Sequence, residues 1–284
     1  MTMTVLVIGA TGKTGRAVVE ALVARGAKVA AGSRTPGTEA ADAAVRPVRF
    51  DWADRASWAP ALDGVDGLYI VGPTGEPVGE VLVGELLADP VAAGLRRVVL
   101  LSVLGADRLP PEVMMADWER DVRASGKDWT ILRPNWFHQN FGGGFAAGIR
   151  EQGVLELPAA DAALSFVDTR DVAEVAAVAL TEDGHAGQVY DITGPQSLTY
   201  AEALKTISAA SGRELAFRPI SHEQAAENLR TAGVGERAII WQRGLYDLML
   251  EGTNAPVTDV VERVTGGAAR SLDAYAAENA DVWR

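Results

Sequence analysis

The chain has 284 residues, of which 48% are hydrophobic and 23% are charged, a composition typical of a globular protein. It contains no cysteine, which excludes disulfides, thiolate zinc sites, iron–sulfur ligation and cysteine nucleophiles. The formal net charge of −12 argues against nucleic acid or an anionic membrane as the main partner. The three histidines, His138, His185 and His222, show no metal-binding spacing, so we expect no metal site.

The first residues show no targeting segment. The apolar run after Met1 ends at Gly9 without a basic flank, and other apolar stretches, such as residues 98–103, are much too short to span a bilayer. We therefore expect a cytoplasmic protein with no membrane partner.

Short apolar runs alternate with helical patterns up to Arg133. The runs are residues 4–8, 28–33, 45–50, 68–71, 97–102 and 128–132, and the helical patterns are residues 16–25, 78–93 and 111–124, with glycines at 26, 94 and 126 as C-terminal stops. Such alternation implies right-handed βαβ crossovers. It predicts an α/β fold with a Rossmann-type doubly wound parallel sheet, and residues 1–133 as its dinucleotide-binding core.

The pattern loosens after Arg133. Capping-box patterns start at Thr199 and Ser221, and residues 189–192 and 215–219 read as short strands. We predict that residues 134–284 form mainly a smaller C-terminal α/β substrate-binding cap, with 164–180 returning to the core and 164–167 as the last core strand. Such caps usually form the substrate pocket.

A glycine-rich segment, Gly9-Ala-Thr-Gly-Lys-Thr-Gly15, joins the first predicted strand to the first helix. Its glycines let the backbone approach a pyrophosphate, and the helix N-terminus supplies amide donors. The segment is not a P-loop, because Val7 stands where that motif needs glycine. The segment therefore predicts dinucleotide binding.

The end of the second predicted strand bears on the choice of cofactor. NAD-preferring sites usually carry an acid there, whereas this chain has Gly32-Ser-Arg-Thr35. The Arg34 guanidinium suits a 2′-phosphate, although a solvated surface arginine is the alternative interpretation. We expect NADP(H) to be favoured, with NAD(H) as the second choice.

Several motifs in order resemble the NmrA-like atypical short-chain dehydrogenases. They are VLVIGATGKTGRAVVEAL near the start, FDW at 50–52, SGKDWTILRPNWFHQNF at 125–141, SFVDTRDVAEVAAVAL at 165–180 and GQVYDITGP at 187–195. Within that family the chain is most similar to the ergot-alkaloid reductase-like and NAD(P)H:quinone oxidoreductase-like branch.

The resemblance implies which residues bind the cofactor and the substrate. Those expected at the pyrophosphate are Gly9, Thr11, Gly12, Lys13, Thr14 and Gly15. Those expected along the rest of the cofactor are Arg34, Asp51, Trp52, Val71, Gly72, Pro73, Ser102, Val103, Pro134 and Asn135. Those expected in the substrate pocket are Met115, Trp118, Trp136, Phe137, Phe141 and Trp241, whose aromatic members suit a planar molecule.

Other interpretations of some residues stay open. Trp136 and Phe137 fit an ordinary core equally well. Asp168 and Asp171 are better interpreted as helix-cap and structural residues than as catalytic ones. We interpret His138 as a loop histidine, because nothing in the sequence places an acid beside it.

The catalytic pair of ordinary short-chain dehydrogenases is missing. No lysine follows a tyrosine by four residues, and Met115 stands where relatives often carry lysine or histidine before the glutamate aligned with Glu119. We therefore identify no catalytic residue. Reduction of a ketone needs a positioned acid, whereas a quinone yields a phenolate with a pKa of about 10, and an iminium acceptor needs no proton.

These features predict an NAD(P)H-dependent oxidoreductase that acts on a quinone-like or other conjugated aromatic small molecule, in secondary metabolism. The chemistry would be reduction, or hydroxylation through an oxygen-reactive hydroquinone. The alternative is a non-catalytic, NAD(P)-sensing NmrA-like regulator. The sequence indicates no oligomeric state.

Overall fold

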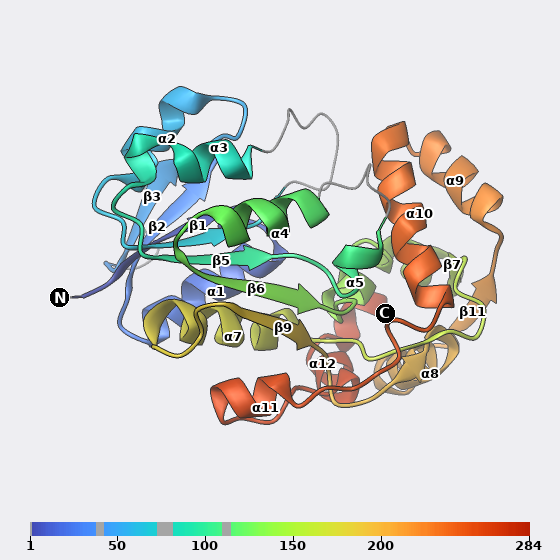
Figure 1. Cartoon of the computed structure of the whole chain (residues 1–284). Coiled ribbons are helices and arrows are strands. Elements are labelled where there is room, and N and C mark those ends of the chain that lie inside the picture. The colour runs from blue at the N-terminus through green and yellow to red at the C-terminus, as the bar shows by residue number, and fades with distance from the viewer. Residues whose placement is uncertain (1, 38–42, 73–81, 110–114) are drawn as a thin grey trace. The chain divides into compact units, whose positions relative to one another are not determined.

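The structure, a computed structural model, describes residues 2–37, 43–72, 82–109 and 115–284 (Figure 1). The chain divides into two compact units. Unit 1 comprises Met1–Val103, Met114–Arg133 and Val172–Tyr190, and unit 2 comprises Leu104–Val113, Pro134–Asp171 and Asp191–Arg284. The described residues contain no helix with the length and hydropathy needed to cross a membrane.

Unit 1 is built around a seven-stranded sheet. The strands are β1 (Thr4–Ile8), β2 (Lys28–Ser33), β3 (Val45–Arg49), β4 (Gly67–Ile70), β5 (Arg97–Leu101), β6 (Asp128–Pro134) and β9 (Gln188–Ile192). Their order is β3-β2-β1-β4-β5-β6-β9, and each pairing from β3 to β6 is parallel. Val5, for example, pairs with Val29 on one side and Gly67 on the other. The predicted Rossmann-type sheet is confirmed.

Helices cover both faces of this sheet, and its central strands β1, β4 and β5 are mostly apolar, as is typical of parallel sheets. Figure 1 shows α1 (Lys13–Ala24) and α7 (Thr169–Thr181) on one face, and α2 (Trp58–Leu62), α3 (Val83–Ala88) and α4 (Met115–Ala124) on the other. The apolar stripe of α1 places Val18 and Leu22 fully in the core. Gly26, at φ +76°, follows the end of that helix, as predicted.

The predicted last core strand at residues 164–167 is wrong. Only β8 (Ala163–Leu164) forms there, and it pairs with β10 (Leu198–Thr199) in a small antiparallel sheet. The backbone N–H of Ser165 donates to the carbonyl of Asn254, and that of Val167 donates to the carbonyl of Trp136, with an isolated parallel bridge between Phe137 and Val167. No strand of the main sheet forms at these residues. The seventh strand of the main sheet is β9, which the sequence pattern had placed in the cap.

Unit 2 packs short strands and helices around its own apolar core. Besides β8 and β10, it contains β7 (Val154–Leu157), which pairs in parallel with β11 (Ala216–Pro219). Its helices are α5 (Gln139–Gly142), α6 (Ala146–Gln152), α8 (Tyr200–Ser211), α9 (His222–Thr231), α10 (Glu236–Leu250), α11 (Val260–Thr265) and α12 (Leu272–Glu278). The capping box predicted at the start of α8 is present, because Thr199 and Glu202 each bond to the other's backbone.

Candidate functional site

The predicted cofactor residues of unit 1 follow the carboxyl ends of five strands. Gly9 follows β1, Arg34 follows β2, Asp51 lies just beyond β3, Val71 follows β4 and Ser102 follows β5. The chain adds β2 and β3 on one side of β1 and then crosses to add β4 on the other side (Figure 1). Dinucleotides bind at the carboxyl ends of strands at such a switch point. The fold therefore brings these residues to the expected edge of the sheet.

The backbone of the glycine turn (residues 9–15) is packed too closely for side chains at two positions. A Cβ on Gly9 would lie 2.7 Å from Cγ1 of Val71, and the φ of Gly9 is +70°. A Cβ on Gly15 would lie only 2.1 Å from the carbonyl oxygen of Gly9. A Cβ on Gly12 would lie 3.2 Å from the same carbonyl oxygen of Gly9, and Gly12 is exposed. Gly9 and Gly15 are thus required by the fold, whereas a Cβ on Gly12 would be tight against the Gly9 carbonyl oxygen without the severe overlap found at the other two positions.

The first turn of α1 fits an anion. Gly12 is the N-cap residue. Because glycine has no side chain, none caps the helix, and the first turn contains no acidic residue. The first backbone N–H groups of a helix have no partner within it and favour negative charge. Lys13 begins the helix, and although the residue as a whole is exposed, partial burial of its amine lowers the pKa of that group. Thr11 and Lys13 are exposed, whereas Thr14 is buried. The cradle therefore suits the pyrophosphate of a dinucleotide.

The ends of β2 and β3 differ in exposure. Arg34 is exposed, and no ion pair links it to another described residue. The Asp51 carboxylate accepts a hydrogen bond from the N–H of Ala53. Trp52 is only 8% exposed, because its indole packs edge-on against Phe50 at a centroid distance of 5.1 Å. Of the predicted cofactor residues Arg34, Asp51 and Trp52, Arg34 is therefore the exposed one.

The end of β4 is covered by a tryptophan of α4. A Cβ on Gly72 would lie 1.9 Å from Cη2 of Trp118, so the indole rests directly on this backbone. Trp118 is 4% exposed and Met115 is 6% exposed, which leaves little of either side chain for a substrate. Pro73, the next residue of the predicted ribose site, lies outside the described residues.

A buried carboxylate joins the ends of β5 and β6. Oε1 of Glu119 accepts hydrogen bonds from the Ser102 hydroxyl at 2.6 Å and from Nε of Arg133 at 2.8 Å. Oε2 accepts from Arg133 at 2.7 Å and from Arg123 at 3.0 Å. Burial raises the pKa of Glu119, but the hydrogen bonds from Arg133 and Ser102 outweigh this effect and hold the pKa below its usual value. The sequence analysis missed this network, for which the one available signal is the i,i+4 spacing of Glu119 and Arg123.

The predicted residues of unit 2 differ in what they offer a ligand. The buried Asn135 amide donates to Ser165 and to the carbonyl of Asn254, and its oxygen accepts from the N–H of Trp136. Phe141 is fully buried, so we assign it to the core. The partly exposed residues are Trp136, Phe137 and Trp241, whereas Pro134 is buried.

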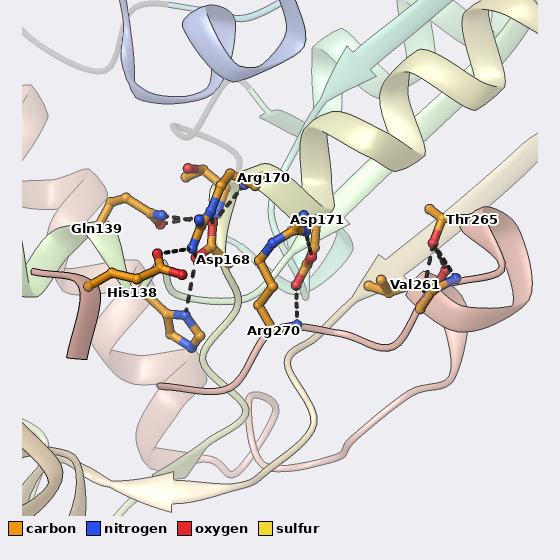
Figure 2. Close-up of polar contacts among 11 residues, drawn as sticks. His138, Gln139, Asp168, Arg170, Asp171, Val261, Thr265 and Arg270 are labelled. Atoms are coloured by element: carbon orange, nitrogen blue, oxygen red, sulfur yellow. Dashed lines mark hydrogen bonds and ion pairs between the residues drawn. The ribbon is translucent and has the colours of Figure 1, made fainter. Parts of the chain in front are cut away.

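Asp168 lies at the centre of a buried polar cluster in unit 2 (Figure 2). Its Oδ1 accepts from the backbone N–H of Arg170 at 2.8 Å and from Gln139 at 2.9 Å, which confirms a helix-capping role at the start of α7. Nδ1 of His138 lies 3.8 Å from Oδ2. The view that no acid lies beside His138 is therefore wrong, because the fold supplies one from a distant segment. Asp171 binds Arg270, which supports its structural interpretation.

Comparison with known proteins identifies the family. Residues 1–247 match the model of the NmrA-like family. The chain belongs to the NmrA-like family. It is 32% identical to the NAD(P)H azoreductase of Xenophilus azovorans, covering 97% of this chain and 98% of that protein. It is 33% identical to a reductase of Streptomyces griseus that is named for a (4-alkanoyl-5-oxo-2,5-dihydrofuran-3-yl)methyl phosphate, covering 98% of this chain and 99% of that one.

A solved structure shares the fold. The NADPH-dependent quinone oxidoreductase from Escherichia coli, complexed with NADPH, superposes with a TM-score of 0.79 at 24% identity, covering 97% of this chain and 99% of that chain. The family resemblance and the Rossmann-type fold expected from the sequence motifs are both confirmed.

Proposed function

We propose that this protein is an NAD(P)H-dependent reductase of quinone-like, azo or other conjugated aromatic small molecules. The observation that carries the proposal is the glycine turn at the switch point of the sheet, where the exposed Gly12 begins α1 with no capping side chain and no acidic residue in the first turn. The azoreductase and the Streptomyces reductase, each similar over nearly the whole chain, support reduction as the activity.

The residues of unit 1 fit the cofactor part by part. Thr11, Gly12 and Lys13, on the exposed side of the glycine turn, would hold the pyrophosphate through backbone N–H groups and the lysine charge. Arg34 would bind a 2′-phosphate by a charge-assisted contact, so we propose NADPH as the preferred cofactor. Gly72 and Val103 would lie along the ribose and the nicotinamide. When bound, the reduced nicotinamide supplies a hydride.

The residues of unit 2 fit a planar acceptor. Trp136, Phe137 and Trp241 are partly exposed, and flat conjugated molecules stack well on aromatic side chains. Trp136 is itself stacked on Tyr246, with ring centroids 5.8 Å apart and an interplanar angle of 12°, which holds its indole in one orientation. Asn135, with its amide bonded on all sides, fixes the backbone from which Trp136 extends.

The test is a panel of acceptors with the full chain. Consumption of NADPH and of NADH is followed with quinones, azo dyes, cationic triarylmethane dyes and an isolated aliphatic ketone. We expect turnover with the conjugated acceptors, none with the ketone, and a preference for NADPH. Oxygen uptake that depends on both cofactor and quinone would reveal hydroxylation through a hydroquinone. Tight cofactor binding without turnover of any acceptor would refute the proposal and favour a cofactor-sensing regulator.

A further inference from the structure

One side of α10 in unit 2 carries a line of four exposed residues, the α10 stripe, which consists of Ile240, Arg243, Asp247 and Leu250. Their spacing of three, four and three residues is the a-d-a-d spacing of a coiled-coil heptad, so they follow one narrow line along the helix. The buried residues of α10 lie outside the stripe and are Ile239, Gly244, Tyr246, Leu248 and Met249. The stripe is therefore the side of α10 that the fold leaves uncovered.

Both ends of the α10 stripe expose apolar surface. Ile240 is 46% exposed and Leu250 is 44% exposed. In the described part of the chain, the other large hydrophobic residues exposed to this degree are Val91 and Val257. A single exposed hydrophobic residue is ordinary, but here two of the four lie on one helix face, about 15 Å apart along its axis. Apolar residues at heptad spacing suit packing against another helix.

The middle of the α10 stripe carries two opposite charges. Arg243 is exposed, and within the described ranges it interacts with Glu223 of α9 without forming an ion pair. Asp247 has a side chain that is 50% exposed, although its Oδ1 lies 3.3 Å from Nε2 of His222 at the start of α9. Helix α9 lies beside α10 (Figure 1). Both charges are therefore open to a partner on the solvent side of the helix.

The order of these four residues is self-complementary. The midpoint of positions 240 and 250 is 245, and the midpoint of positions 243 and 247 is also 245. A two-fold axis at that level would bring a second α10 alongside in the antiparallel direction. Ile240 would then lie opposite the partner's Leu250, and Arg243 opposite the partner's Asp247, and each contact would occur twice. A parallel second helix would instead place like charges opposite each other.

We propose that this protein forms a two-fold symmetric homodimer through the α10 stripe. A second copy of the chain is the partner that fits, because the antiparallel arrangement pairs every charge with its opposite and every apolar end with an apolar end. A single pair of helices makes a small interface, so the dimer should be weak and concentration-dependent. This inference is independent of the proposed reductase activity.

The test is sedimentation equilibrium of the full chain over a range of concentrations. The wild type should pass from monomer to dimer as the concentration rises. Arg243→Asp and Asp247→Arg each place like charges opposite each other at two points, so each should raise the dissociation constant by about tenfold or more. The control is Arg218→Asp, which makes the same change of charge at a 63% exposed side chain on β11 and should leave the constant unchanged.

Mixing the two charge variants is the decisive measurement. The Arg243→Asp chain presents two acids on the stripe and the Asp247→Arg chain presents two arginines, so a mixed dimer joins an acid to an arginine at both points. The equimolar mixture should therefore dimerise at concentrations where each variant alone is monomeric. Mixing cannot repair a folding defect or the loss of the contact between Asp247 and His222.

The apolar ends give an independent check. Ile240→Asn and Leu250→Asn should each weaken the dimer, because each removes apolar surface from the interface at two points. A wild type that stays monomeric at every concentration would overturn the inference. So would a dimer that none of the four stripe substitutions weakens, or a mixture of the two charge variants that stays monomeric.

Discussion

The carboxylate of Asp168 lies 3.8 Å from the imidazole of His138, and neither side chain is more than 1% exposed (Figure 2). The same carboxylate binds the guanidinium of Arg170, whose other partner is Glu278 in α12 at 2.9 Å. Asp168 therefore links α5, the start of α7 and the C-terminal helix α12. This arrangement indicates that Asp168 has a role in stability, and its consequences are measurable.

Asp168→Asn should destabilise the protein at neutral pH. Hydrogen bonds to a charged group contribute about 1.5–3 kcal/mol, so we expect a loss of that order in the free energy of unfolding from urea titrations. Burial raises the pKa of Asp168, but His138 and Arg170 lower it far below its usual range. The stabilising effect is therefore complete above the unfolded-state pKa of about 3.9 and is lost as the pH falls below it.

The difference between wild type and Asp168→Asn should accordingly be constant near neutral pH and shrink in acid. Asp161→Asn, at an exposed position of the same unit, is the control and should change the stability little. A difference that grows as the pH falls would contradict the assignment.

Substitutions in the glycine turn should separate folding from cofactor binding. Gly12→Val should leave the protein folded and abolish NADPH binding, because the branched side chain would occupy the space of the pyrophosphate. Gly15→Ala should lower the melting temperature instead, because its Cβ would lie 2.1 Å from the Gly9 carbonyl oxygen. Thermal unfolding and calorimetric titration of both variants provide the check. Undiminished affinity in folded Gly12→Val would show that the pyrophosphate binds elsewhere.

Arg34→Ala should weaken NADPH binding and leave NADH binding nearly unchanged. A charge-assisted contact contributes about 1.5–3 kcal/mol, which corresponds to a roughly ten- to hundredfold loss of affinity. Because Arg34 is exposed, added salt should reduce the preference of the wild type for NADPH. Arg46→Ala removes another exposed charge, near the start of β3, and serves as the control. Equal losses for both cofactors in Arg34→Ala would assign this arginine to the adenine or to the fold.

Gly72→Ala and Trp118→Leu should be strongly non-additive. The added methyl group would lie 1.9 Å from the Trp118 indole, so Gly72→Ala alone should destabilise the protein. Replacing the indole with a smaller side chain removes the clash, so the double variant should be more stable than the sum of the single effects predicts. Residues in contact usually couple by about 0.5–3 kcal/mol, which a double-mutant cycle by urea unfolding resolves. Additive effects would show that the two residues are not in contact.

The parts of the fold that sequence predicts best are those set by local patterns. The strands at residues 4–8 and 28–33 match β1 and β2 end to end, because a buried parallel strand is a continuous apolar run bounded by turn residues. Because these strands are parallel, the residues that follow their carboxyl ends all lie at the same edge of the sheet. The grouping of Gly9, Arg34 and Val71 at that edge follows from this rule.

Contacts between distant segments could not be predicted in this way. The run at 164–167 is mostly apolar, like a core strand, yet its backbone hydrogen bonds go to Asn254 and Trp136, which lie in other parts of the chain. The approach of Asp168 to His138 likewise depends on tertiary packing, as does the contact between His222 and Asp247. Polar side chains of this kind have no periodic pattern, so one sequence gives no signal of which pairs meet.

The unequal space around the three glycines of the turn matters for the evolution of related chains. A descendant that lost its cofactor would still need glycine at positions 9 and 15, because the carbonyl of Gly9 and the side chain of Val71 occupy the room a Cβ would take. A side chain at position 12 would press only on the Gly9 carbonyl oxygen, 3.2 Å from its Cβ, so it would disturb the fold less than a side chain at position 9 or 15. A glycine motif with only position 12 altered would therefore mark a relative that has kept the architecture and given up the dinucleotide.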